Sequence, residues 1–148
     1  QKRDVTPRSA YQRNFDYNKF WCEVTDGREI VTAIAYAIDR GDKKQIAFQN
    51  ILRAIGFDVK LKPFISRIDG SSKGDWDVGI AIDVMEFASK SDTVVLASGD
   101  GDFNLLLRHI RAKFNTDSEV YGVPNLTSSA LQAEATIFKA IDDKLLLR

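Results

Sequence analysis

Two aspartates separated by a single glycine stand in the most distinctive short segment of the chain. Asp100 and Asp102 belong to the segment SGDGDF at residues 98–103, which follows an apolar stretch and precedes a helical pattern. In a parallel α/β sheet this position is the carboxyl edge, where ligands bind. Carboxylate oxygens are the ligands that hard divalent cations prefer. The segment therefore indicates a metal site, and helix capping by either aspartate is the alternative interpretation.

A second acidic segment opens the preceding helical pattern. The segment KGDWDV at residues 73–78 places Asp77 in the first helical turn, and Asp83 lies further along the same helix. The helix dipole favours an aspartate in the first turn, so Asp77 also has a purely structural explanation. Asp83 comes six residues after Asp77, which turns its side chain roughly 120° away at helical periodicity. Because aspartate is a poor helix former, we expect Asp83 to have a special partner.

Carboxylates gathered from these two segments would repel one another without a counter-ion. A pair of divalent cations about 3.5–4 Å apart can activate a water and stabilise the leaving oxygen in phosphodiester cleavage. We therefore expect a divalent cation beside these acids, and Mg²⁺ usually takes one or two carboxylates together with water and phosphate.

The charges are unevenly distributed, although Lys+Arg and Asp+Glu are equal at 21 each. Residues 53–73 carry five cations and two acids, whereas residues 74–104 carry seven acids and one cation. Lys62, Arg67 and Lys73 could hold the phosphate backbone of a nucleic acid. Simple solvation on a strand and a loop explains each of them equally well.

Apolar periodicity predicts the elements that position these residues. Strands are expected at residues 30–38, 57–65, 93–98, 119–123 and 137–141. Helices are expected between Asp16 and Gly27, over 42–55 with Gly56 as the stop, and over 76–88, 102–114 and 127–135. This alternation predicts one α/β domain over residues 1–148, a three-layer α/β/α sandwich with a mainly parallel sheet.

Composition excludes several classes of protein. Apolar residues make up 44% and charged residues 28% of the 148 residues, as in an ordinary compact domain. No apolar run approaches the roughly 20 residues of a membrane span. No signal peptide is evident, and the single cysteine cannot form an internal disulfide. We therefore expect a cytoplasmic protein that does not contact a membrane.

The chain lacks the residues that several other kinds of catalytic site require. His109 is the only histidine, so no zinc ligand set can be assembled. The chain has no G-x-S-x-G elbow, P-loop or G-x-G-x-x-G segment. Trp76 and Phe103 flank the acids and could stack on a base, although Phe103 also fits a core position. Thr127 follows the next strand, where it could meet a phosphate or simply cap a helix.

The two acidic segments at this spacing resemble the NYN family of PIN-like domains, in its bacterial LabA-like branch. The segments VYGVP at residues 120–124 and LTSSAL at residues 126–131 are similar to the same branch, and the similarity covers residues 14–147. The resemblance implies a Rossmann-like α/β/α sandwich and metal-dependent cleavage of RNA. It also implies metal-site acids at Asp77, Asp100 and Asp102, a recurrent acid at Asp83, and a small residue leading the acidic turn at Ser98.

The start of the chain departs from this family pattern. The family opens with an apolar strand that ends in an aspartate, a central metal ligand, followed three residues later by an asparagine. Residues 1–7 read QKRDVTP, with no apolar run before Asp4 and with Pro7 in place of the asparagine. We expect the first strand to be missing from this chain or degenerate within residues 1–13, with Asp4 as the candidate metal ligand.

Two functions follow from these expectations. The first is a Mg²⁺- or Mn²⁺-dependent RNA endonuclease. Its one or two cations are held by Asp77, Asp100 and Asp102, and Asp83 assists the catalysis. The predicted RNA contacts are Lys62, Arg67, Lys73, Ser98 and Thr127. The second is a catalytically degenerate PIN-like domain that binds RNA or a protein without cutting, which the departure at the amino terminus favours. A Toprim-like enzyme also uses an acidic pair after a strand, but no strand end here offers the glutamate that it needs. A homodimer is left open.

Overall fold

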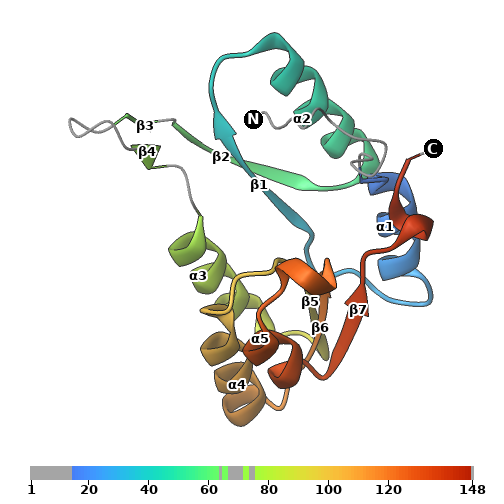
Figure 1. Ribbon diagram of the computed structural model, residues 1–148, viewed down its shortest axis with the longest axis vertical. Coiled ribbons are helices and arrows are strands. Elements are labelled where there is room, and N and C mark those ends of the chain that lie inside the picture. The colour runs from blue at the N-terminus through green and yellow to red at the C-terminus, as the bar shows by residue number, and fades with distance from the viewer. Residues whose placement is uncertain (1–14, 64, 67–71, 74–75, 148) are drawn as a thin grey trace.

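Parallel strands form the centre of the molecule. The computed structural model describes residues 15–63, 65–66, 72–73 and 76–147 (Figure 1). Strands β1 (Ile34–Asp39) and β2 (Asp58–Pro63) pair in parallel, and β6 (Asp117–Gly122) lies in parallel between β5 (Thr93–Ala97) and β7 (Ile137–Ala140). A short antiparallel pair, β3 (Ile65–Ser66) and β4 (Ser72–Lys73), follows β2. The α/β class and the mainly parallel pairing are confirmed.

The two helices before the acidic segments are bounded by the capping aspartates and the terminating glycine that were predicted from the sequence. The amide of Lys19 donates to the Asp16 carboxylate at 3.1 Å to cap α1 (Tyr17–Thr25), and Lys44 donates to Asp42 at 2.8 Å to cap α2 (Lys43–Ile55). Helix α2 ends at Gly56, which has φ of 138° and lies under the Trp21 ring. A Cβ at Gly56 would lie 2.6 Å from the Trp21 ring, so both the backbone and the packing require glycine there.

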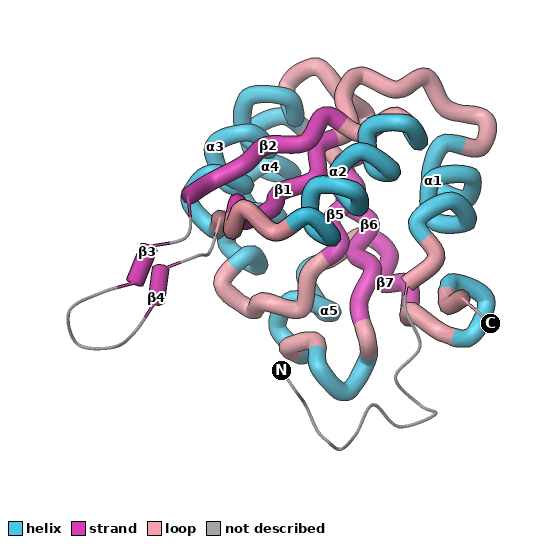
Figure 2. The backbone as a smooth tube through the Cα atoms, turned by 90° about the horizontal axis from the view of Figure 1, so that it is seen from above, coloured by secondary structure: helices cyan, strands magenta, loops and turns pink. Residues whose placement is uncertain are grey.

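Helices cover both faces of the β5–β6–β7 sheet, as Figure 2 shows. Val120 faces a core formed with α3 (Asp77–Ala88), α4 (Phe103–Phe114) and α5 (Ser129–Glu134), in which Leu107 and Ile110 are almost fully buried. The next residue, Tyr121, faces the opposite side and packs against Phe20 of α1 and Leu145 of the 3₁₀ helix η2 (Asp143–Leu145). Neighbouring strand residues thus face two different cores, which produces the expected layering of helix, sheet and helix.

Several boundaries differ from the sequence expectation for physical reasons. The apolar run at residues 30–38 does not pair over its whole length, since Ile30 and Val31 are 42% and 51% exposed and strand β1 begins at Ile34. The last predicted helix starts later than residue 127, because Ser128 caps α5 by accepting the amide hydrogen of Leu131. The pair β3–β4 was not predicted, since neither of its two-residue strands carries a periodic signal.

The sheet is divided into two parallel parts within the described residues. Strand β1 pairs only with β2, and β5 pairs only with β6, so each has one edge without a described partner strand. The predicted missing or degenerate first strand at residues 1–13, including Asp4, lies outside the described residues. None of the described helices is long and apolar enough to cross a membrane.

Truncation of a core side chain should lower the free energy of unfolding far more than truncation of an exposed side chain. Leu107 is 2% exposed on α4, whereas Leu126 is 77% exposed in the 3₁₀ helix η1 (Pro124–Leu126). We expect Leu107→Ala to lower the free energy of unfolding by about 2–5 kcal/mol, and Leu126→Ala by less than about 0.5 kcal/mol. Urea unfolding followed by circular dichroism measures both, and equal losses would contradict the assigned core.

Candidate metal centre

Three carboxylates converge where α3 and α4 begin. One oxygen from each of Asp77, Asp100 and Asp102 lies within 4.8 Å of the others. Asp77 is the first residue of α3, and the other two stand in the turn between β5 and α4. The two segments singled out from the sequence therefore meet at one place in the structure.

Capping does not explain this group. Asp102 occupies the N-cap position of α4, but its side chain makes no capping hydrogen bond there. One oxygen of Asp100 accepts the amide hydrogen of Asp102 at 2.9 Å, which tightens the turn and orients that carboxylate. The capping alternative is thus excluded for Asp102, and Asp100 stabilises the turn rather than the helix.

Glycines hold the acidic turn against the segment that follows β6. The amide of Ser128 donates to the Gly99 carbonyl at 3.2 Å, and a Cβ at Gly99 would lie 2.5 Å from the Leu126 carbonyl oxygen. A Cβ at Gly101 would lie 2.7 Å from the Ser128 hydroxyl. At Gly99 only glycine permits so close an approach of two backbones, and at Gly101 it leaves room for the Ser128 side chain. These contacts hold the turn that carries the aspartates.

Of the two predicted RNA-contacting hydroxyls, that of Ser98 bonds within the acidic turn and that of Thr127 bonds within the segment that follows β6. Ser98 accepts the amide hydrogen of Asp100 at 3.1 Å, and Thr127 donates to the Val123 carbonyl at 2.8 Å. Thr127 is only 7% exposed, so it supports the backbone behind the cluster instead of presenting its hydroxyl to solvent. The expectation that Ser98 and Thr127 contact RNA stays a prediction.

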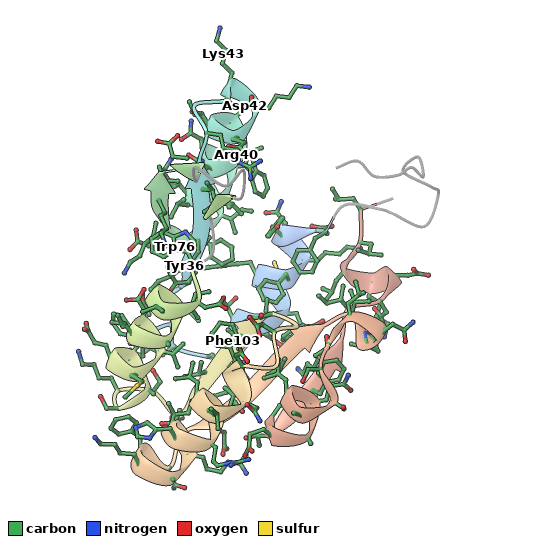
Figure 3. All side chains as sticks on the ribbon, turned by 60° about the vertical axis from the view of Figure 1, so that its left-hand side comes forward. Tyr36, Arg40, Asp42, Lys43, Trp76 and Phe103 are labelled. Carbon is green, nitrogen blue, oxygen red and sulfur yellow. The ribbon has the colours of Figure 1, made fainter. Side chains whose placement is uncertain are left out.

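Trp76 anchors the start of α3 to β1. Its indole N–H donates to the Ala37 carbonyl at 2.9 Å, and its ring lies 5.3 Å from that of Tyr36 (Figure 3). A Cβ at Gly79 would lie 2.6 Å from the Trp76 ring, so the indole also packs closely on the first turn of its own helix. These contacts position Asp77, the residue that follows.

Asp83 lies apart from the cluster and has other partners. It accepts the Tyr36 hydroxyl at 2.7 Å and the Lys60 ammonium at 2.9 and 3.0 Å. Burial alone would raise the pKa of Asp83, but the hydrogen bonds from Lys60 and Tyr36 and the charge of Lys60 bring it below its ordinary value. Burial together with the hydrogen bond to Asp83 raises the pKa of Tyr36.

The assisting catalytic role expected for Asp83 stays a prediction, and its carboxylate bonds Tyr36 and Lys60 outside the cluster. Asp83 comes six residues after Asp77 on α3, so the two side chains point in different directions, as the helical spacing indicated. Asp83 instead ties α3 to both strands of the β1–β2 pair. Tyr36 and Lys60 were not identified from the sequence, and the only signal for them was the unusual place of an aspartate in mid-helix.

The donor set suits a small hard cation. Oxygens around Mg²⁺ lie about 2.0–2.1 Å from the ion, which separates neighbouring ligand oxygens by roughly 3–4 Å. Oxygens that already lie within 4.8 Å of one another need only small side-chain rotations to reach that separation. Asp77 and Asp100 are half-buried and Asp102 is exposed, which leaves room for waters or a phosphate. Asp77, Asp100 and Asp102 are thus the residues that could hold Mg²⁺ or Mn²⁺.

The NYN domain family matches residues 3–142, which is most of the chain. The chain belongs to the NYN domain family. The Low amplitude and bright protein LabA of Synechococcus elongatus is 32% identical over 91 residues, and this match covers 57% of the chain and 49% of LabA. The chain thus spans about half the length of this curated relative. The family and the LabA-like branch predicted from the acidic segments are confirmed.

A solved structure supports the same fold for this NYN domain. A protein of unknown function from Vibrio parahaemolyticus is 55% identical and superposes with a TM-score of 0.89. The match covers 96% of this chain and 88% of that chain. The similarity in fold therefore extends over nearly the whole NYN domain.

The predicted basic contacts of the NYN domain are only partly described. The Lys62 ammonium lies 5.5 Å from the centre of the Trp76 ring, beside the start of α3. Arg67 lies outside the described residues, and of Lys73 only the backbone, in β4, is described. Lys62 is thus the one predicted cation whose side chain is seen next to the metal-site helix.

We expect the Asp83→Asn variant to be less stable than the native NYN domain at pH 7, because asparagine carries no charge to pair with Lys60. The folded-state pKa of Asp83 lies below its ordinary value. Its contribution is therefore present above the ordinary aspartate range and is lost as the pH falls through the folded-state pKa.

Urea unfolding of both proteins at pH 7 and near pH 3 measures this effect. The difference in the free energy of unfolding should shrink at the lower pH. A difference that persists undiminished would show that charge pairing is not what Asp83 contributes. Asp117→Asn serves as a control, because Asp117 is exposed at the start of β6.

Proposed function

We propose that this NYN domain is a Mg²⁺- or Mn²⁺-dependent ribonuclease that hydrolyses internal phosphodiester bonds of RNA. The observation that carries the proposal is the convergence of Asp77, Asp100 and Asp102 at the start of two adjacent helices. Membership of the NYN family, a PIN-like nuclease family, supports the same chemistry. Three half-exposed or exposed carboxylates at a sheet edge can take one or two cations and still admit a phosphate.

Each residue of the site has a defined task in this proposal. Asp77, Asp100 and Asp102 hold the cation, which when bound supplies a Lewis acid and an activated water for attack on phosphorus. The hydrogen bond from the Asp102 amide fixes one oxygen of Asp100 and leaves the other available to the ion. Trp76 fixes the position from which Asp77 points. The preorganised oxygens reduce the rearrangement that metal binding requires.

Cations beside the cluster would hold the RNA backbone. Lys62 stands over the Trp76 ring next to the first turn of α3, where a phosphate approaching the carboxylates would pass. Arg67 and Lys73 are kept in the proposal as contacts predicted from the sequence. Lys60 is assigned no RNA contact, because its ammonium is paired with Asp83. The cytoplasmic location and the homodimer also stay predictions.

The second candidate function is a degenerate NYN domain that binds RNA or a protein without cutting. It is favoured by Pro7, which stands where the family pattern has an asparagine. Such a domain should neither bind Mn²⁺ tightly nor cleave RNA when Mn²⁺ is added. The enzyme should do both.

We expect the Asp100→Asn variant to lose RNA cleavage by at least roughly 100-fold, because the amide weakens cation binding and removes one charge from the donor set. The measurement is the cleavage of a fluorescent single-stranded RNA as Mn²⁺ or Mg²⁺ is titrated. Glu86→Gln is the matched control, since Glu86 is an exposed acid on α3 outside the cluster. This control should keep full activity.

Thermal unfolding of all three proteins separates loss of chemistry from loss of fold. Cleavage that persists in folded Asp100→Asn with metal present would remove the central role assigned to this carboxylate. A native protein that neither binds Mn²⁺ tightly nor cuts any of a varied set of RNAs would favour the degenerate binding module.

A further inference from the structure

A small pocket lies between the carboxyl end of β1 and the first half of α2. Its volume is about 260 Å³, and the described residues that line it are Ala37, Ile38, Arg40, Gln45, Phe48 and Gln49. Ligands of parallel α/β sheets bind at this end of the strands, where Arg40 follows β1 (Figure 3). Pockets for drug-sized ligands measure about 300–1,000 Å³, so this one suits a smaller molecule. None of its residues belongs to the carboxylate cluster.

The face of α2 that lines the pocket is polar, although the buried face of a helix is usually apolar. Gln45, Phe48 and Gln49 are three and four positions apart and therefore share one face of the helix. Gln49 is only 4% exposed, whereas Ile46 and Ile51 of the same helix are 47% and 54% exposed. Burial of an amide beside exposed isoleucines is unfavourable for folding. A helix that served packing alone would have the opposite arrangement.

The side chain of Gln45 has an acceptor oxygen without a donor. Gln45 is the third residue of α2, from which a glutamine commonly accepts the amide hydrogen of the capping residue. Its Oε1 is instead buried and has no hydrogen-bond partner. An unpaired buried acceptor is unfavourable, and a rotation at the end of this flexible side chain would bring it to a donor in the pocket. A ligand that satisfies Gln45 therefore carries an N–H group.

Phe48 supplies a flat apolar wall beside the two amides. It is 40% exposed, and its ring lies 5.2 Å from that of Tyr17 in an edge-to-face contact. A ring held by such a contact loses little freedom when a second ring stacks on it. Proteins recognise unpaired nucleobases in this way, by stacking them on aromatic side chains and hydrogen-bonding their edges.

The amides favour adenine among the nucleobases. A glutamine pairs with adenine through two hydrogen bonds, in which its oxygen accepts from the N6 amino group and its amide nitrogen donates to N7. Uracil presents a carbonyl oxygen in place of that amino group. No carboxylate of the described residues lines the pocket, so the lining does not repel the phosphate of a nucleotide.

We propose that the pocket between β1 and α2 binds the adenine base of a nucleotide, with Phe48 against the ring and Gln45 and Gln49 at its edge. An RNA strand and a free mononucleotide share this chemistry. RNA is the favoured source, because the Ala37 carbonyl accepts the Trp76 indole N–H at 2.9 Å and Trp76 directly precedes the metal-site residue Asp77. The assignment to RNA rests on the proposed function, whereas the binding of adenine does not.

Fluorescence anisotropy of labelled adenylate and uridylate RNAs of about six nucleotides tests the proposal on the full chain. EDTA is present, so that no metal-dependent cleavage intervenes. The native chain should bind the adenylate RNA at least about fivefold more tightly than the uridylate RNA, which is the discrimination that one bidentate amide contact gives. Calorimetric titration with adenosine monophosphate identifies the source. Affinity far below that of the adenylate RNA indicates a strand, and equal affinity would overturn the assignment to RNA in favour of a free nucleotide.

Two variants test the residues of the pocket. Gln45→Leu should stay folded, because the buried oxygen that it removes makes no hydrogen bond, and it should lose the preference for adenylate RNA. Phe48→Ala should weaken the binding of adenylate RNA at least about fivefold through the loss of stacking. Asn50→Leu is the matched control, because Asn50 is an exposed amide of α2 that does not line the pocket. This control should bind RNA as the native chain does.

Thermal unfolding checks that each variant is folded. Equal binding of the two RNAs by the native chain would overturn the proposal, and so would a failure to bind adenylate RNA and adenosine monophosphate alike. A folded Gln45→Leu protein with the same preference as the Asn50→Leu control would overturn it as well. A native chain that prefers adenylate RNA but cleaves no RNA with Mn²⁺ would count against the proposed nuclease and leave the adenine site standing.

Discussion

Repulsion among three carboxylates is the constraint on which this structure depends. Asp77, Asp100 and Asp102 bring one oxygen each to within 4.8 Å, which is unfavourable without a cation between them. Packing holds in place both of the segments that carry these acids. A glycine turn packed against the loop after β6 carries two of the acids, and a helix start anchored by Trp76 carries the third. A divalent ion would convert the repulsion into attraction and stabilise the folded chain.

Helix α3 connects the two parts of the sheet as well as carrying Asp77. Ile80 and Val84 pack against the core of the β5–β6–β7 part, while Trp76 and Asp83 bond to the β1–β2 part. Within the described residues no strand pairing joins these two parts of the sheet. The contacts of α3 therefore help to hold the two parts together. Asp83 thus matters to the site through the placement of its helix, although its carboxylate is bonded elsewhere.

Local chemistry made part of this site predictable from the sequence. Asp100 and Asp102 follow an apolar strand directly, and Asp77 opens a helix, so topology alone brings them to one edge of the sheet. The partners of Asp83 could not be found in this way, because Tyr36 and Lys60 lie 47 and 23 residues away and no pattern links them. The burial of Thr127 could not be predicted either, because it depends on how the loop folds back over Gly122 and Val123.

The most direct test of the account is to locate Mn²⁺ by anomalous diffraction in crystals of the native chain grown with that ion. The account predicts an ion bound by one oxygen each from Asp77, Asp100 and Asp102, at about 2.1–2.3 Å. The same crystals of Asp100→Asn should lose this ion while the surrounding turn keeps its shape. An absence of anomalous density at the three carboxylates under saturating Mn²⁺, or an ion bound only elsewhere, would contradict the account.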